Sequence, residues 1–157
     1  MEKNENGRSG RGDMELKAIG VIRSPYCTMD QAPFQGRFSS DEAELEIYEE
    51  YAGGLKDVEA SRYLIVLYWG HLADRGVLQT VTPWGPEIRG VFACRSPSRP
   101  NPVELCMVEL LRREGNRLVV RGLDAVDWSA VVDIKPYSAR IDCFPEADIG
   151  WFEEEPE

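Results

Sequence analysis

The sequence predicts an all-β protein, a small antiparallel barrel of six or seven strands with long loops at one end. Three observations predict this fold class. Short apolar segments rich in β-branched and aromatic residues recur along the chain, turn signals built from Gly, Pro, Asn and Asp separate them, and no segment has the apolar spacing of an amphipathic helix. The sequence also lacks internal repeats, G-x-G-x-x-G, a P-loop and strand–helix alternation, which argues against a doubly wound nucleotide-binding fold.

One folded domain is expected over residues 15–145, because a chain of 157 residues can bury a hydrophobic core in a single domain. Residues 1–14 are rich in charges, Asn and Gly at their start. Such a segment cannot bury enough apolar surface to offset the entropy lost on ordering, so we expect a disordered N-terminal arm. Residues 146–157 are expected to form an acidic C-terminal tail.

Three segments in the first half of the chain are expected to be strands. Residues 16–22 (LKAIGVI) are short, apolar and β-branched, and residues 43–48 (AELEIY) alternate small or apolar residues with acids. Residues 63–69 (YLIVLYW) are the most apolar segment and predict a fully buried central strand. Between these strands, residues 23–41 predict a long loop and residues 51–58 (YAGGLKDV) predict one helical turn.

The second half of the chain predicts four more strands. Residues 80–88 (TVTPWGPEI) form a loop that leads into a strand at residues 90–94 (GVFAC). Residues 103–111 and 117–122 are apolar or alternating, and the EGN segment between them predicts a hairpin turn. Residues 131–134 are expected to form the last strand.

The net charge of −10 argues against a protein that holds nucleic acid by bulk electrostatic attraction. Acidic residues concentrate between Asp41 and Glu59 and between Asp142 and Glu157. The central stretch instead collects arginines and predicts a possible local basic face. These arginines are Arg89, Arg95, Arg99, Arg112, Arg113, Arg117 and Arg121.

The cysteines and the single histidine predict no metal site. The four cysteines, in no C-x-x-C pair, are expected to be reduced thiols, and His71 alone is too few ligands for structural zinc. The cysteines are Cys27, Cys94, Cys106 and Cys143. No apolar run approaches the roughly 20 residues that span a bilayer, and no secretory signal begins the chain, so we expect a cytoplasmic protein with no membrane partner.

The first segment with candidate chemistry is residues 95–102 (RSPSRPNP). Its three prolines fix φ and remove backbone donors, so Arg95, Arg99 and Asn101 are held on a stiff turn at the end of a predicted strand. Guanidinium groups in such a turn suit a carboxylate, a phosphate or a stacked base. The alternative is a rigid surface loop with salt-bridged arginines.

The second candidate is a group of polar residues around the last predicted strand. Asp124, Asp127, Asp133, Lys135 and Tyr137 are placed where carboxylates, an ammonium and a phenol can converge on one pocket. Asp127 could accept from a ribose hydroxyl or an amine, and Asp133 could act as a base. The alternative is an ordinary ion pair between Asp133 and Lys135, with a simple turn at residues 127–129.

Two further signals are weaker. His71 follows the most apolar strand, where it is either a structural side chain or a proton carrier with a pKa near neutrality. In the long loop, Pro33, Phe34 and Gln35 offer an aromatic face and an amide that suit an adenine ring and its edge.

Three motifs carry a resemblance to a known family. Residues 19–26 (IGVIRSPY), 90–105 (GVFACRSPSRPNPVEL) and 131–137 (VVDIKPY) resemble the TsaA-like family of β-barrel methyltransferases, whose best-known members are the tRNA adenosine N6-methyltransferases, TrmO. The resemblance covers residues 16–143. The RSxxRPNP and DIKPY motifs at this separation are specific.

This resemblance implies a small antiparallel barrel, usually a homodimer, with S-adenosylmethionine bound by loops at the strand ends near the subunit interface. It implies methylation of the exocyclic nitrogen of threonylcarbamoyl-adenosine beside the tRNA anticodon. Phe34 stands where the family has Arg, Leu72 where it has Gln, and Trp128-Ser129 where it has Gly-Thr; the two aromatic rings can attract a sulfonium. The implied cofactor-binding residues are Pro33, Phe34, Gln35, His71, Leu72, Arg95, Leu105, Val126, Asp127, Trp128 and Ser129.

Methyl transfer to an acylated adenine nitrogen needs a group that removes a proton, and Asp133 and His71 are the predicted candidates. The residues predicted to position the nucleic-acid substrate are Arg99, Asn101, Lys135 and Tyr137. Two alternatives stay open: a methyltransferase of the same fold that acts on a small metabolite, and a non-catalytic module that binds S-adenosylmethionine.

Overall fold

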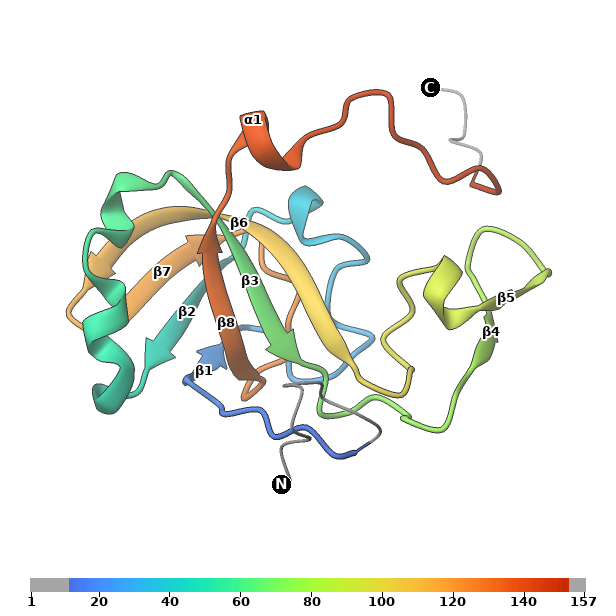
Figure 1. The fold of residues 1–157 in the computed structure, drawn as a ribbon, viewed down its shortest axis with the longest axis horizontal. Helices are drawn as coiled ribbons and strands as arrows, with labels where there is room; N and C mark the ends of the chain where they lie inside the picture. The colour runs from blue at the N-terminus through green and yellow to red at the C-terminus, as the bar shows by residue number, and fades with distance from the viewer. Residues whose placement is uncertain (1–11, 153–157) are drawn as a thin grey trace, which may run out of the picture.

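The computed structural model describes residues 12–152, so most of the predicted N-terminal arm and the end of the acidic tail lie outside the described residues. Six strands close an antiparallel barrel in the order β1-β2-β7-β6-β3-β8 (Figure 1). The barrel strands are β1 (Gly20–Arg23), β2 (Glu42–Ile47), β3 (Tyr63–Trp69), β6 (Val103–Glu114), β7 (Arg117–Arg121) and β8 (Ala130–Pro136). The predicted all-β barrel is confirmed.

Alternation along each strand builds the core. In β3, Leu64, Val66 and Tyr68 are buried in the barrel, while Ile65 and Leu67 lie on the outer surface and are half-buried. The prediction that this strand is buried on both faces is therefore wrong, because a strand of a closed barrel has one face toward the core and one face outward. The rest of the core consists of aliphatic residues from all six barrel strands, Cys106 of β6, and Leu55, Leu123 and Ala125 from outside the strands.

The β6–β7 hairpin forms as predicted. Its turn at residues 114–116 contains Gly115 with φ +65°, a left-handed conformation that costs least for glycine. β6 extends three residues further than predicted, to Glu114. A register shift between Leu110 and Arg112 bends this long strand around the barrel.

A β-bulge determines which residues of β8 face inward. Tyr68 pairs with Val131 and Leu67 pairs with Asp133, so Val132 is the extra residue. Beyond the bulge, Ile134 lies opposite the buried Val66 and packs against the core. Asp133 and Lys135 consequently lie on the outer face of the barrel.

Residues 90–94 do not form the predicted strand. They form a 3-10 helix, η4 (Val91–Ala93), after a two-stranded hairpin of β4 (Gln79–Val81) and β5 (Ile88–Gly90) that lies apart from the barrel. Arg99 explains the difference, because its Nη2 donates to the carbonyl oxygens of Val91 and Cys94, both at 2.7 Å. These two carbonyls therefore accept hydrogen bonds from the Arg99 side chain and not from the backbone amides of a neighbouring strand.

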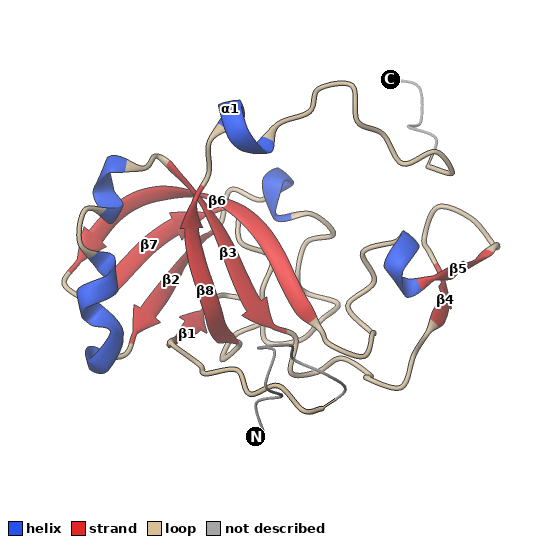
Figure 2. Ribbon diagram, viewed as in Figure 1, coloured by secondary structure: helices blue, strands red, loops and turns tan. Residues whose placement is uncertain are grey.

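Short helices and loops complete the chain (Figure 2). The predicted helical turn is present as two 3-10 helices, and a third one interrupts the long loop. After α1 (Ala139–Asp142), the chain runs back toward the β4–β5 hairpin, where Trp151 Nε1 donates to the carbonyl of Ala93 at 3.0 Å. Within the described part of the chain, no helix has the length and hydrophobicity needed to cross a membrane. The 3-10 helices are η1 (Gly36–Phe38), η2 (Glu49–Leu55) and η3 (Val58–Ala60).

A close backbone contact between β1 and β2 gives the first prediction. A Cβ atom at Gly20 would lie 2.3 Å from the carbonyl oxygen of Glu46, whereas one at Gly53 would meet nothing within 4 Å. Gly20→Ala must push these strands apart and is expected to lower the free energy of unfolding by about 1–3 kcal/mol. Gly53→Ala is the matched control. Urea denaturation of both variants measures the effect, and equal midpoints would contradict it.

Candidate functional site

A cavity of about 480 Å³ opens among the loops at one end of the barrel. Its walls come from the long loop after β1, the turn after β3, the segment between β4 and β5, the RSxxRPNP loop and the segment before β8. Eight residues implied by the family resemblance line it: Pro33, Phe34, Gln35, His71, Leu72, Arg95, Val126 and Ser129. The structure thus brings together most of the predicted cofactor-binding positions from four separate segments.

Two contacts hold the long loop against the barrel. Near its start, the hydroxyl of the buried Tyr26 donates to Asp41 Oδ2 at 2.9 Å and lies 2.8 Å from Ser39 Oγ. In its middle, Gly36 lies so close to Gly122 that a Cβ atom at Gly36 would be 2.1 Å from the carbonyl oxygen of Gly122. The loop that carries residues 33–35 is therefore fixed at the edge of the cavity.

The floor of the cavity is polar: Asp124 belongs to the polar group that the sequence predicted to line a pocket, whereas Tyr68 and Glu104 were not predicted. Tyr68 of β3 and Glu104 of β6 are paired across the strands, and both lie in the cavity lining with Asp124. The Tyr68 hydroxyl donates to Asp124 Oδ1 at 2.8 Å. Burial is the main cause that raises the pKa of all three groups, and the Asp124 charge raises that of Tyr68 further.

A thiol lies below these groups. Cys106 is buried, and its Sγ donates to the carbonyl of Gly122 at 3.2 Å. Burial, and then the charge of Asp124, raise the pKa of this thiol to about 12. The thiol is therefore protonated and unreactive at neutral pH, as expected for a structural cysteine.

Aromatic rings form part of the cavity edge. The rings of Phe34 and Trp84 meet edge-to-face with centroids 5.4 Å apart, and both side chains remain largely exposed. Phe152 packs against the same tryptophan at 5.0 Å. Trp84 was missed by the sequence reasoning because it lies between two prolines in a segment with no strand pattern. Exposed rings at a cavity edge can stack on a flat ligand.

Arg95 and His71 occupy the cavity wall. Arg95 is exposed and forms no ion pair or side-chain hydrogen bond within residues 12–152, so its guanidinium is available to an anionic group. His71 is also exposed, and its Nδ1 lies 3.5 Å from Ser129 Oγ. Because Ser129 Oγ itself donates to the Val126 carbonyl at 2.7 Å, it can accept from Nδ1–H of His71 and leave Nε2 free.

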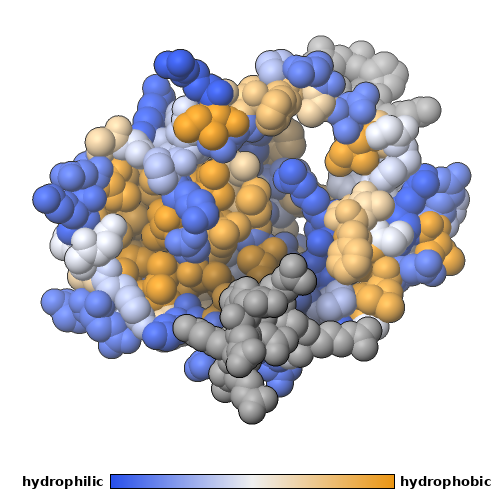
Figure 3. Space-filling view, in the orientation of Figure 1, coloured by the Kyte–Doolittle hydropathy of each residue, from blue (hydrophilic) through white to orange (hydrophobic). Residues whose placement is uncertain are grey.

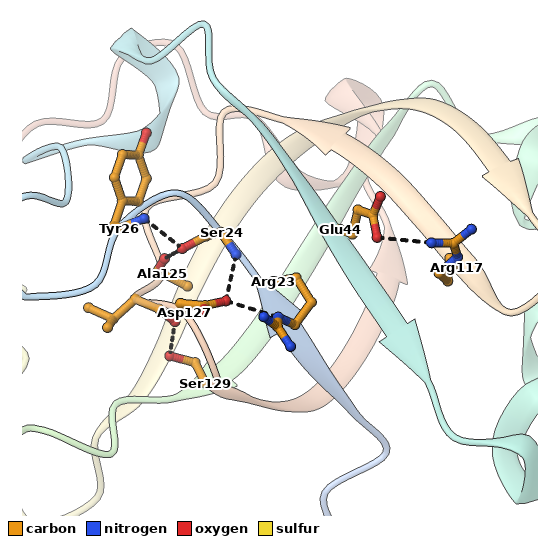
Figure 4. A network of polar contacts seen from close by, with 9 residues as sticks. Arg23, Ser24, Tyr26, Glu44, Arg117, Ala125, Asp127 and Ser129 are labelled. Carbon is orange, nitrogen blue, oxygen red and sulfur yellow. Dashed lines mark hydrogen bonds and ion pairs between the residues drawn. The ribbon is translucent and has the colours of Figure 1, made fainter.

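Asp127 and Trp128 lie outside the cavity lining. Asp127 Oδ1 accepts from Arg23 Nε at 3.2 Å and from the backbone amide of Ser24 at 3.0 Å, and Ser24 Oγ donates to the carbonyl of Ala125 at 2.7 Å (Figure 4). Trp128 has φ +68°, and the Arg23 guanidinium lies 3.9 Å from its ring centroid. Both residues belong to a turn that holds the end of β1 in place. This agrees with the alternative given for the sequence, a simple turn at residues 127–129.

Asp133 and Lys135 are separated from the cavity. Their side chains form an ion pair at 2.7 Å and line a second cavity, of about 550 Å³, that η2 and η3 border. The expectation that the acids around the last strand converge on one pocket is therefore wrong, because the bulge at Val132 turns this pair outward. Leu105 likewise lies on the outer face, opposite Leu67, and is partly exposed.

The predicted substrate-positioning residues also lie outside the lining of the cavity. Arg99 Nε donates to the Ser96 carbonyl at 2.7 Å, and its Nη2 is bonded to two more carbonyls, so this side chain holds its own loop together. Asn101 Oδ1 accepts from Arg75 at 3.3 Å. Tyr137 is half-buried after β8, where its backbone amide donates to the Tyr63 carbonyl.

The central arginines do not form a basic face. The arginines of β6 and β7 are distributed among glutamates on the outer surface of the barrel, and each is ion-paired. Exposed pairs of this kind add little stability, but they cancel the local positive charge. The pairs are Arg112–Glu114, Arg113–Glu59, Arg117–Glu44 and Arg121–Glu109.

The architecture is a closed antiparallel barrel with a loop-lined cavity at its mouth, which is a common position for small-molecule sites. Residues 21–143 match the family model of the tRNA-methyltransferase O N-terminal domain, and the chain belongs to this family. The resemblance to TsaA-like barrels predicted from the three motifs is thereby confirmed.

Two relatives come from Archaeoglobus fulgidus. An S-adenosyl-L-methionine-binding protein is 56% identical over 130 residues, which cover 83% of this chain and 94% of that protein. A probable S-adenosyl-L-methionine-binding protein is 54% identical over 141 residues, which cover 90% of this chain and 38% of that protein. The chain therefore spans less than half the length of the second relative.

The tRNA (adenine(37)-N6)-methyltransferase of Escherichia coli K12 is 33% identical over 159 residues, which cover 90% of this chain and 65% of that enzyme. The crystal structure of TrmO from Pseudomonas aeruginosa superposes with a TM-score of 0.78 and 27% identity, and covers 93% of this chain and 66% of that chain. The similarity to both concerns the barrel and leaves about a third of each unmatched.

The turn at Asp127 gives the second prediction. Asp127→Ala leaves the Arg23 guanidinium and the Ser24 amide without their acceptor, and we expect the free energy of unfolding to fall by about 1–3 kcal/mol. Glu44→Ala, which removes one ion-pair partner of Arg117 that is more exposed than Asp127, is the control and is expected to cost about 0–1 kcal/mol. Urea denaturation compares the two, and a loss for Glu44→Ala equal to or larger than that for Asp127→Ala would contradict the anchoring role.

Proposed function

We propose that this chain binds S-adenosylmethionine in the cavity at the barrel mouth and transfers its methyl group to an adenine nitrogen of tRNA. The observation that carries the proposal is the convergence of eight family-implied positions, from separate loops, on one cavity. Its volume of about 480 Å³ is in the range of sites for small molecules and cofactors.

The residues present suit the chemical groups of this cofactor. S-adenosylmethionine supplies a methyl group activated by a positively charged sulfur. The unpaired Arg95 can bind a carboxylate, and the aromatic rings of Phe34 and Trp84 can stack on adenine or face a cation. The carboxyl groups of Glu104 and Asp124 favour positively charged or hydrogen-bond-donating groups at the floor. Among residues 12–152, no group of three or more His, Cys, Asp and Glu side chains is placed to hold a metal ion.

The tRNA substrate rests on the E. coli relative, whose printed name is tRNA (adenine(37)-N6)-methyltransferase. This chain offers aromatic rings for stacking at the cavity edge, which suits an unpaired base. Its arginines on the barrel surface are neutralised, and its net charge is −10. We therefore expect few phosphate contacts and a shallow dependence of RNA binding on salt.

The same charge distribution favours a second candidate function, a methyltransferase of this fold acting on a small metabolite. Such an acceptor needs no basic surface and requires only the cavity. A labelled-cofactor assay distinguishes the two candidates, because the methyl label enters either RNA or a small molecule. Cofactor binding with no transfer to any acceptor would leave a non-catalytic binding module.

Arg95 gives the third prediction. Calorimetry is expected to detect S-adenosylmethionine binding to the unmodified protein and a loss of about 1.5–3 kcal/mol of binding free energy in Arg95→Ala, because a charge-assisted hydrogen bond to the carboxylate is removed. Arg140→Ala is the matched control, since Arg140 is exposed on α1 and lines neither cavity. Methyl label is then expected to enter the adenosine of unfractionated tRNA.

Three outcomes discriminate among the proposals. No cofactor binding to the unmodified protein would overturn the proposed function at its first step. Equal affinity in Arg95→Ala and Arg140→Ala would remove Arg95 from the site and leave the cofactor assignment standing. Label that appears only in small-molecule acceptors would replace tRNA by a metabolite.

We also propose that the protein is a homodimer, as the family resemblance implies. The outer surfaces of β3 and β6 carry exposed apolar side chains, and hydrophobic residues gather over the barrel in Figure 3 with hydrophilic residues between them. The partly exposed members of this apolar face include Val103, Leu105, Met107 and Tyr63. Apolar faces of this kind on a sheet mark contacts with another protein surface, and a second copy presents the same face for a symmetric contact.

The apolar face gives the fourth prediction. Leu105→Glu places a charge at its centre and is expected to shift the protein from dimer to monomer, because burying an unpaired carboxylate opposes association. Leu16→Glu, at an exposed leucine before β1, is the control. Sedimentation velocity reports the mass of each variant. A monomeric unmodified protein, or a Leu105→Glu variant that remains dimeric, would contradict this assembly.

A further inference from the structure

Glu104 is an acidic residue on the inward face of a barrel strand. Along β6, Cys106 and Val108 face the core and are buried, and Glu104 precedes them with the same alternation. On the adjacent strand β3, Glu104 pairs with Tyr68, whose side chain also faces inward. The Glu104 side chain therefore points into the barrel mouth, where it lines the floor of the cavity.

One carboxylate oxygen of Glu104 has no partner. Oε1 is buried and forms no hydrogen bond within the described structure, whereas the neighbouring Asp124 accepts from Tyr68. A Cβ atom at Gly70 would lie 3.5 Å from this Oε1, which places the oxygen beside the turn that leads to His71. A buried oxygen without a donor is costly in a folded protein, and it is best explained by a donor that a ligand supplies.

Glu104 lines the proposed cofactor cavity, whereas the predicted base Asp133 does not. Asp133 lies on the outer face of β8 and is ion-paired with Lys135. Asp124 has its oxygen engaged by the Tyr68 hydroxyl. Asp30 also belongs to the cavity lining, but it is exposed to solvent, so Glu104 is the lining acid that has a buried oxygen without a partner in the described structure.

We propose that Glu104 is the general base of the methyl transfer, an assignment that rests on the proposed function. The acceptor nitrogen forms a bond to the methyl carbon, the carbon–sulfur bond breaks with its electron pair retained by sulfur, and the N–H proton of the acceptor passes to Oε1 of Glu104. The charge of the sulfonium is thereby neutralised, and the proton leaves later from Glu104 to solvent.

The surroundings of Glu104 suit this role. Burial is the main cause that raises the pKa of Glu104, the charge of Asp124 raises it further, and the positive charge of Arg99 opposes the shift. Tyr68 from β3 and His71 from the following turn line the same cavity. A carboxylate with a raised pKa is a stronger base than an exposed one, which helps it to accept a proton from a weakly nucleophilic amide-like nitrogen.

Glu104→Gln gives the fifth prediction. Glutamine keeps the shape but cannot accept the proton, so the single-turnover methylation rate on tRNA, measured at saturating cofactor, is expected to fall about 10²–10⁴-fold. The matched control is Glu109→Gln, on the same strand but on the outer face, where the carboxylate pairs with Arg62 and Arg121. Its rate is expected to equal that of the unmodified protein.

The pH dependence provides a signature that a structural role would not produce. A base acts when deprotonated, so the rate of the unmodified protein is expected to rise with pH through the raised pKa of Glu104. In Glu104→Gln this acidic limb is expected to disappear. Glu109→Gln is expected to retain it.

A readout independent of activity tests the environment of Glu104. Because its pKa is raised in the folded protein, Glu104 favours folding most below its ordinary value of 4.5 and loses this contribution as pH rises through the folded pKa. Glu104→Gln is therefore expected to melt at a higher temperature than the unmodified protein, by a margin that grows with pH. Asp124 is present in both proteins, but its charge interacts with that of Glu104, so the melting difference reports the titration of the two carboxyl groups together.

The outcomes are separable. Unchanged rate and pH profile in Glu104→Gln, with active unmodified protein, would overturn the base assignment and leave the proposed function intact. Cofactor binding by the unmodified protein without any methyl transfer would overturn the proposed function and the base role together. A melting difference that does not increase with pH would contradict the buried, unpartnered state of the carboxylate on which the assignment rests.

Discussion

The hydrogen bond from the Tyr68 hydroxyl to Asp124 connects the barrel core to the candidate site. Tyr68 is the last inward side chain of β3, and Asp124 begins the segment that crosses from β7 to β8. This bond holds the segment over the barrel mouth, where Val126 and Ser129 form a wall of the cavity. The same segment continues to Asp127, which fastens the end of β1. A phenol inside the barrel is thus linked, through the segment between β7 and β8, to the end of β1 from which the long loop starts.

Local patterns predicted most of the barrel. The alternation in residues 43–48 and the apolar run at residues 63–69 placed β2 and β3 within one residue of their observed bounds, and the EGN segment predicted the turn between β6 and β7. The β4–β5 hairpin was missed because its strands have only three residues each and pair away from the core, so they leave no apolar periodicity. The strand expected at residues 90–94 failed for a nonlocal reason, since Arg99 binds its carbonyls.

The site was predicted where short motifs mark loops at the mouth and missed where it depends on register. A bulge of one residue at Val132 reverses the face of the following side chains, so Asp133 was assigned to the wrong surface. The inward direction of Glu104 was readable in principle, because it shares the alternation of Cys106 and Val108. An isolated acid on the apolar face of a strand is the signal that would have identified it.

The polar side chains whose burial opposes folding lie at the end of the barrel that carries the cavity. Aliphatic side chains such as Leu45 and Val66 fill the interior of the barrel. The mouth instead contains Tyr68, Glu104 and Asp124. Burying these groups opposes folding, and the well-packed remainder of the barrel compensates. The arginines on the outer surface of β6 and β7 contribute little to recognition, since their pairs with glutamates leave little net field there. In the proposed function, recognition therefore depends on a few buried polar groups and exposed rings at one mouth, and such a site needs no basic surface to bind a nucleic-acid base.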